Sequence, residues 1–216
     1  MRRLLIASLL VLLHLPVWAD GQTANLPDPK DDAALARQTT PQTAILAGGC
    51  FWGVQAVFQH VKGVISATSG YAGGSAATAN YETVSSGTSG HAETVKVIYD
   101  PATISYGRLL KIYFAVAHNP TELNRQGPDT GTQYRSVIFA ANAEQQRIAE
   151  SYIGQLDAAH IYPKQIATKV AGPSPFYPAE SYHQDFAALH PNHPYIVFND
   201  RPKVEHLKEL FPHLYH

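Results

Sequence analysis

The pattern of hydrophobic and polar positions predicts strands and helices that follow one another along most of the chain. Residues 43–47 form a short apolar run that ends at two glycines, which indicates a buried strand. Directly after them, apolar side chains at helical spacing predict a helix that opens at Cys50; they are Phe51, Trp52, Val54, Val57, Phe58 and Val61. Further strands are predicted over residues 64–71, 94–99, 133–140 and 165–170.

Two later helices have capping residues at their predicted starts. Ser105 can cap a helix that runs to about residue 118, and Asn142 can cap one that runs to about residue 159. From residue 172 onward, seven prolines and many aromatic residues predict an ordered coil with a short helical piece over residues 179–189. Because strands and helices interleave, we expect an α+β domain, a two-layer α/β sandwich with a mixed sheet, packed helices and this long C-terminal coil.

The beginning of the chain lacks the pattern of a packed domain. Two arginines precede an apolar run over residues 4–13, and small residues follow where a signal peptidase cuts, which predicts a signal peptide over residues 1–19. An uncleaved anchor is the alternative. Residues 20–42 carry prolines among polar side chains, so we expect a flexible tether there and a catalytic domain over residues 43–216. The protein is expected to be exported to the periplasm, without stable membrane association.

Composition and charge narrow the functional classes. The 216 residues are 45% apolar and 15% charged, which is typical of one globular domain with a real core. A formal net charge of −1 offers no field that would attract nucleic acid. Eleven histidines invite a metal hypothesis, but none has the close pairing of a zinc site on one helix. His190 and His193 can form at most a weak site, so we expect no metal and no cofactor.

Cys50 is the only cysteine in the chain. A lone cysteine is either an inert buried thiol or a reactive one. At the first turn of a helix, its thiolate would face free backbone N–H groups and the positive end of the helix dipole, which predicts a lowered pKa and favours the reactive interpretation. A cysteine hydrolase or acyltransferase that uses a distant histidine such as His183 stays open at this point. So does a non-catalytic binding module.

Residues 49–53, with the sequence GCFWG, resemble the signature pentapeptide of the A-type peptide methionine sulfoxide reductases. Other segments resemble the same family in the same order along the chain: NYE at 80–82, GHAE at 90–93, LNRQG at 123–127, Asp129, GTQYRS at 131–136, FYPAE at 176–180 and YHQ at 182–184. The similarity spans residues 43–200. It implies an oxidoreductase that returns methionine-S-sulfoxide, free or in proteins, to methionine and so repairs oxidised proteins.

The resemblance assigns catalytic roles to four residues. Cys50 attacks the sulfoxide sulfur, and Glu93 supplies the proton that the departing oxygen needs. Glu93 can do so if an apolar pocket raises its pKa and keeps it neutral. Tyr81 and Tyr134 can donate hydrogen bonds to the sulfoxide oxygen as negative charge grows there. From the residues alone, a surface position for Glu93 and core packing for the tyrosines stay open.

Three further residues are expected to bind the substrate. Phe51 and Trp52 can form an apolar wall for the methyl group of the sulfoxide, although both also fit the core stripe of a helix. Asp129 is expected to accept a hydrogen bond that helps to position the site, with an exposed loop aspartate as the alternative.

The chain departs from many members of the family in two ways. It has no second cysteine, so an external thiol, from a thioredoxin-like partner or another reductant, must reduce the sulfenic acid on Cys50. In addition, Asn119 stands where many relatives carry aspartate. Asparagine keeps the hydrogen-bonding shape but cannot ionise, so a structural role is expected there.

Overall fold

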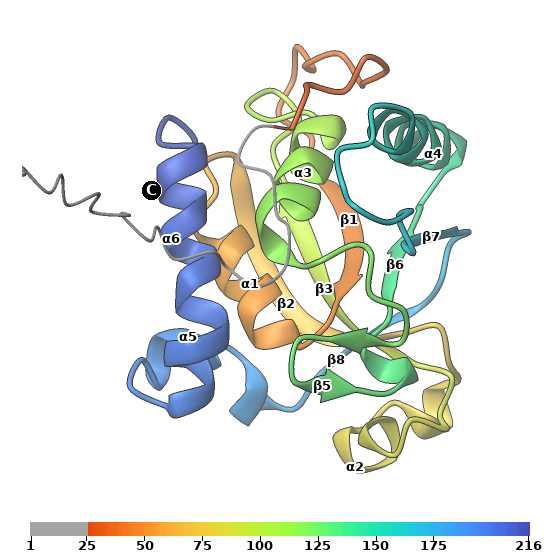
Figure 1. The fold of residues 1–216 in the computed structure, drawn as a ribbon, viewed down its shortest axis with the longest axis vertical. Helices are drawn as coiled ribbons and strands as arrows, with labels where there is room; N and C mark the ends of the chain where they lie inside the picture. The colour runs from red at the N-terminus through yellow and green to blue at the C-terminus, as the bar shows by residue number, and fades with distance from the viewer. Residues whose placement is uncertain (1–25) are drawn as a thin grey trace, which may run out of the picture.

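The computed structural model describes residues 26–216 (Figure 1), so the predicted signal peptide lies outside the described residues. A six-stranded sheet in the order β7-β6-β1-β3-β2-β8 forms its centre. The strands are β1 (Gln42–Gly48), β2 (Val64–Ala72), β3 (Ala92–Tyr99), β6 (Ser136–Phe139), β7 (Lys169–Ala171) and β8 (Phe176–Pro178). All neighbours pair antiparallel except β6 and β7, which are parallel. The sheet is therefore mixed, as predicted.

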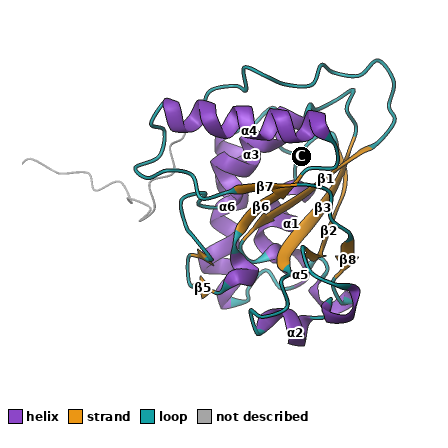
Figure 2. Cartoon of the chain, turned by 90° about the vertical axis from the view of Figure 1, so that its right-hand side faces the viewer, coloured by secondary structure: helices purple, strands orange, loops and turns teal. Residues whose placement is uncertain are grey.

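The helices gather to one side of the sheet (Figure 2). The longer ones are α1 (Phe51–Gln59), α3 (Tyr106–Ile112), α4 (Ala143–Ala158) and α6 (Arg201–Leu210). A π-helix over Tyr113–Ala117 continues α3, and short elements complete the chain: α2 (Tyr81–Ser85), α5 (Phe186–Leu189), the small hairpin β4 (Arg125–Gln126) and β5 (Asp129–Thr130), and a π-helix over Ile196–Asp200.

Side-chain alternation along the strands explains the two layers. In β1, Ala44 and Leu46 belong to the large core cluster that the helices share, whereas Ile45 and Ala47 belong to a small cluster on the other face. Residues two apart on a strand point to the same face, so one face carries the main core. The predicted two-layer α+β architecture is confirmed. Among residues 26–216, no helix combines the length and apolar character that a bilayer crossing requires.

Both predicted helix caps are confirmed. The Ser105 hydroxyl accepts from the backbone N–H of Arg108 at 3.2 Å, and the Asn142 side chain accepts from that of Gln145 at 2.9 Å. The prediction of a C-terminal coil, in contrast, is incomplete. Residues 201–210 form the helix α6, which packs beside α1 (Figure 1). Pro202 stands in its first turn, where a missing N–H costs nothing, so the proline starts this helix instead of preventing it.

The predicted tether over residues 20–42 is wrong for its described part, which is docked on the helices. Leu26 is 1% exposed within the main core cluster. Asp32 accepts from the Ser105 hydroxyl at 2.5 Å and from the backbone N–H of Gly107 at 2.7 Å. The segment is held by scattered contacts: Leu26 and Ala33 pack on the core, carboxylates accept from α3, and backbone groups bond to α4. Because these contacts follow no periodic pattern, the composition indicated a free chain.

Candidate active site

Cys50 is the N-cap residue of α1, as the pattern predicted, and is 8% exposed. The chain reaches it through Gly49, whose φ of +86° lies in the left-handed region. A side chain at position 49 would collide with Gln126, whose Cγ would lie 2.4 Å from the added Cβ. The strand β1, this glycine turn and α1 together hold the thiol at the end of a helix, inside the protein.

The expected lowering of the Cys50 pKa is wrong. Burial raises the pKa of the Cys50 thiol well above its usual range, and the carboxylates of Glu93 and Asp200 raise it further. The backbone N–H of Trp52 and the ammonium of Lys203 act in the opposite direction, but the loss of hydration outweighs them. The helix terminus therefore favours the thiolate as expected, and the buried thiol is nevertheless protonated at neutral pH.

Glu93 lies in β3 and is 3% exposed. Its Oε2 accepts a hydrogen bond from the backbone N–H of Phe51 at 3.0 Å, at the first residue of α1. Burial raises the pKa of Glu93 to about 8; Asp129 and Asp200 add to the effect, while the Phe51 amide opposes it. Glu93 is thus a largely neutral acid at pH 7, next in space to the end of α1 that carries the cysteine.

Two other elements carry the predicted tyrosines of the site. Tyr81 is the first residue of α2, and Tyr134 is the last residue of the 3-10 turn over Thr132–Tyr134. Burial raises the pKa of both phenols, and the charges of Glu93 and Cys50 raise each of them further. Both tyrosines therefore stay neutral phenols that can donate hydrogen bonds, and their role toward the substrate stays a prediction.

Asp129 and Tyr195 form a hydrogen-bonded pair at the same site. The Tyr195 hydroxyl donates to Asp129 Oδ2, so Asp129 is an acceptor within the protein. Burial raises the pKa of Tyr195, and Cys50 is the next largest cause. Tyr195 was missed by sequence reasoning because it lies in the C-terminal segment, which was expected to be coil. Its only sequence signal is an aromatic residue beside a proline.

The two aromatic residues after the cysteine take different positions. Phe51 is 1% exposed and packs in the core against Tyr71, with ring centroids 5.9 Å apart. Trp52 is half-buried and stacks on Phe186 at 3.8 Å, nearly parallel. Its Nε1 donates to Nδ1 of His183 at 3.2 Å. Phe51 therefore fills the core, whereas Trp52 is packed against Phe186 and His183; the role of both toward the substrate stays a prediction.

His183 orients Trp52 and does not act as the base of a cysteine hydrolase. Its Nδ1 accepts from the indole, and burial lowers the pKa of the ring. Its other ring nitrogen, Nε2, has no hydrogen-bond partner among residues 26–216. A hydrolase needs a histidine in contact with the thiol. The arrangement thus argues against that alternative.

Two polar side chains of the segment after β8 accept hydrogen bonds from the elements around the site. Glu180 accepts from the backbone N–H of Tyr81 at 2.9 Å and from the Tyr71 hydroxyl at 2.8 Å. Gln184 Oε1 accepts from Gln55 on α1 at 3.1 Å and from the backbone N–H of Ser69 on β2 at 3.0 Å. These residues fix α2 and α1 relative to the sheet, so they position Tyr81 and Cys50.

Asn119 has the structural role expected of it. Its Oδ1 accepts from the backbone N–H and the hydroxyl of Thr121, at 3.0 and 2.8 Å. Its backbone carbonyl accepts from Gln126 Nε2 at 3.0 Å. Because Gln126 is the side chain that packs on Gly49, this turn supports the glycine bend before the nucleophile.

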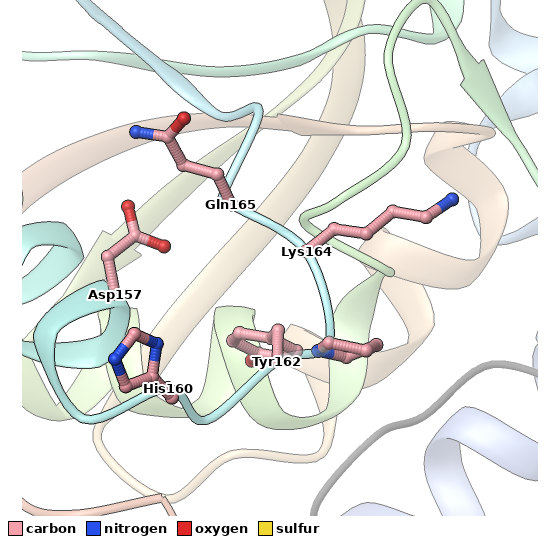
Figure 3. A pocket seen from close by; sticks show the side chains of 6 residues that line it. Asp157, His160, Tyr162, Lys164 and Gln165 are labelled. Atoms are coloured by element: carbon pink, nitrogen blue, oxygen red, sulfur yellow. The ribbon is translucent and has the colours of Figure 1, made fainter.

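A hollow that is not lined by Cys50 lies at the C-terminal end of α4 (Figure 3). It has a volume of about 290 Å³, and its lining is mostly polar: Asp157, His160, Tyr162, Pro163, Lys164 and Gln165. Asp157 is already engaged, since its Oδ1 accepts from the backbone N–H of Ile166 at 3.0 Å. Within residues 26–216, no group of three or more histidine, cysteine or acidic residues is placed to hold a metal ion.

Comparisons with known proteins agree with one another. The family model described as peptide methionine sulfoxide reductase matches residues 42–214. A peptide methionine sulfoxide reductase of Mesorhizobium japonicum is 63% identical over 174 residues, which cover 81% of this chain and 89% of the relative. Another, from Synechocystis, is 48% identical over 188 residues, which cover 86% of this chain and 88% of the relative.

Two solved structures are also similar. The reduced form of Mxr1 from Saccharomyces cerevisiae has a TM-score of 0.65 at 30% identity and covers 76% of this chain and 92% of its own. Methionine sulfoxide reductase A of Corynebacterium diphtheriae has a TM-score of 0.61 at 34% identity, with coverages of 78% and 85%. By sequence and by structure, this chain belongs to the peptide methionine sulfoxide reductase family.

Proposed function

We propose that this chain reduces methionine-S-sulfoxide, free or within proteins, to methionine, with Cys50 as nucleophile and Glu93 as proton donor. One observation carries the proposal: the buried carboxyl of Glu93 accepts from the N–H of Phe51, the residue directly after Cys50. The acid and the nucleophile are thereby held at the same helix end. The identities of 63% and 48% to relatives that carry the name of this activity support the reaction.

The proposed first step transfers one oxygen atom. The Cys50 sulfur forms a bond to the sulfoxide sulfur while neutral Glu93 protonates the sulfoxide oxygen. The sulfur–sulfur bond then breaks as the hydroxyl group moves from the substrate to the Cys50 sulfur, and the proton of the Cys50 thiol replaces the one that Glu93 gave. A thiol and a sulfoxide thereby become a cysteine sulfenic acid and a thioether. Tyr81 and Tyr134 donate hydrogen bonds to the oxygen as its negative charge grows. Trp52 offers its ring to the methyl group.

The second step needs thiols from outside the chain, because Cys50 is the only cysteine. One thiol attacks the sulfenic acid, forms a mixed disulfide with Cys50 and releases water. A second thiol then releases Cys50 and leaves as part of a new disulfide. A thioredoxin-like partner can supply both thiols. Together with the sequence of residues 1–19, this supports a role in repairing oxidised proteins in the periplasm, served by an exported reductant.

The test is an assay of dithiothreitol-driven reduction of a methionine sulfoxide peptide, with the two sulfur epimers resolved. We expect the S epimer to be consumed and the R epimer to be left. Cys50→Ser should abolish the reaction. Equal consumption of both epimers, or turnover by the serine variant, would contradict the proposal.

A further inference from the structure

A cluster of buried polar side chains lies behind the turn that leads to Cys50, and the proposed reaction does not use it. Its members are at most 7% exposed: Tyr113, His118, Ser136 and Thr168. They come from the π-helix that continues α3, from the residue after that helix, from β6 and from the residue before β7. Polar side chains at this depth specify a single arrangement when their hydrogen bonds are satisfied.

The Ser136 hydroxyl is the centre of this polar cluster. It lies 2.8 Å from the Tyr113 hydroxyl, 2.7 Å from His118 Nε2 and 2.7 Å from the Thr168 hydroxyl. Burial lowers the pKa of His118 to about 3, so its ring is neutral. His118 Nδ1 lies 3.1 Å from the carbonyl of Tyr113, which can only accept, so Nδ1 carries the ring proton. Nε2 then accepts from the Ser136 hydroxyl, which gives the cluster a defined direction of hydrogen bonding.

The polar cluster contacts the last residues of β1. The Tyr113 hydroxyl donates to the backbone carbonyl of Ala47 at 2.6 Å. The His118 ring packs on Gly48, where an added Cβ would lie 3.0 Å from the ring Cγ. Ser136 is paired with Gly48 in the ladder between β1 and β6. The end of the strand is therefore fixed by a hydrogen bond, a ring and a neighbouring strand at once.

This support acts two residues before the nucleophile. Gly48 and Gly49 separate the strand from Cys50, and glycine has more backbone freedom than any other residue. A turn of two glycines has one conformation only where its surroundings impose it. The polar cluster does so at Gly48, as Gln126 does at Gly49. The position of the thiol thus depends on side chains that lie behind the turn.

We propose that this polar cluster is a positioning element that holds Cys50 in the geometry for attack on the sulfoxide sulfur. It acts through the backbone of Ala47 and Gly48. A displacement of about 1 Å between reacting groups can slow a reaction by about 10²-fold, so the loss of one bond to this backbone has a measurable effect. The inference rests on the proposed role of Cys50 as nucleophile.

Tyr113→Phe removes the hydrogen bond to Ala47 and keeps the ring that fills the core. At saturating methionine-S-sulfoxide, the single-turnover rate should fall about tenfold. The sulfoxide concentration that gives half of the maximal rate should not change, because Trp52 keeps its own contacts with Phe186 and His183. The loss therefore lies in the chemical step and not in binding.

Alkylation by iodoacetamide reports the position of the thiol without any sulfoxide. Cys50 is 8% exposed, and a loosened turn should expose it more often, so Tyr113→Phe should be alkylated about tenfold faster. Because Cys50 is the only cysteine, the labelled site is unambiguous. Faster alkylation together with slower sulfoxide reduction is the result that misplacement predicts.

Tyr152→Phe is the matched control. Tyr152 is 1% exposed, and its hydroxyl donates to the backbone carbonyl of Pro27 at 2.8 Å, so the same kind of bond is removed away from the turn. Both rates should stay at the parent values. Ser136→Ala removes the central hydroxyl and should repeat the effects of Tyr113→Phe; it decides alone if Tyr113→Phe does not fold.

The proposal is overturned if either rate in Tyr113→Phe matches that in Tyr152→Phe, if both rates change in the same direction, or if the loss disappears at saturating sulfoxide. These outcomes are separate from the failure of the proposed function. A parent chain that reduces no sulfoxide overturns the function, whereas the alkylation of Cys50 still reports whether the polar cluster holds the turn.

Discussion

Carboxylates occur in two regions of this protein, and their surroundings give them opposite properties. In the docked N-terminal segment, Asp28 is exposed and pairs with Arg108 and Lys111 of α3. The hydrogen bond from Lys111 is the largest influence on it, and the pKa of Asp28 is lowered. At the end of α1, burial raises the pKa of both Glu93 and Asp200. Solvent and cationic partners hold Asp28 ionised at the surface, whereas loss of hydration keeps Glu93 largely neutral at pH 7.

The largest effect is expected from a substitution in the buried region, on the rate of the chemical step. Glu93→Gln removes the proton donor but keeps a side chain that fits the site, so the single-turnover rate should fall by about 10² to 10⁴. The deficit should shrink as the pH falls and solvent becomes a better acid. The advantage of the parent enzyme over the variant should also narrow as the pH rises through about 8, where Glu93 loses its proton. Asp28→Asn is the matched control, and a Gln variant with near-parent rates would remove Glu93 from the mechanism.

The pH dependence of stability should have opposite signs in the two regions. The pKa of Glu93 is raised from 4.5 to about 8, so the folded state binds this proton more tightly than the unfolded state. Its contribution to the free energy of unfolding is full below about pH 4.5 and is lost as the pH rises through about 8. Urea denaturation at pH 5 and pH 8 should show that Glu93→Gln loses less stability over this range, by on the order of 4 kcal/mol. Equal losses in the two proteins would show that Glu93 is not a buried neutral acid.

A smaller effect is expected where the N-terminal segment meets α3. Asp32→Ala removes the acceptor for the Ser105 hydroxyl and the Gly107 N–H, both at the start of that helix. We expect the free energy of unfolding to fall by about 1–2 kcal/mol, because buried donors lose their partner. Chemical denaturation measures this, and the activity should not change. A loss of activity that matches the loss of stability would mean that the segment also supports the site.

The smallest effect is expected at Asp28, whose side chain is 65% exposed. Asp28→Asn should lower the free energy of unfolding by at most about 1 kcal/mol, since exposed ion pairs contribute little. The lowered pKa of Asp28 means that its contribution is present above its usual pKa of about 4 and is lost as the pH falls. Thermal melts at neutral pH and near pH 3 check this, and a difference that grows on acidification would contradict it.

Local patterns in the sequence were enough to predict the parts of the fold that depend on neighbouring residues. The run over residues 43–47, the glycines after it and the stripe from Phe51 predicted β1, the turn and α1, and Ser105 and Asn142 predicted two helix starts. Each of these signals lies within a few residues of the feature that it predicts. The order of the strands has no such local signal and came only from the structure.

The site was predicted less completely, because its properties arise between distant segments. Tyr195, Asp200 and Lys203 reach Cys50 only through the packing of α6 on α1, which no periodicity near them shows. The pKa of Cys50 was predicted with the wrong sign for the same reason. The sequence shows that Cys50 stands at the start of a helix, but it does not show the burial, whose effect on the pKa of the thiol is larger.

Trapping the oxidised cysteine tests the central claim most directly. The protein is mixed with one equivalent of methionine-S-sulfoxide and dimedone, without any reductant, and the intact mass and the methionine formed are measured. We predict one dimedone adduct per chain, on Cys50, with one methionine released, and slower formation of both in Glu93→Gln. Methionine formed without an adduct, or adduct formation at the parent rate in Glu93→Gln, would contradict the mechanism.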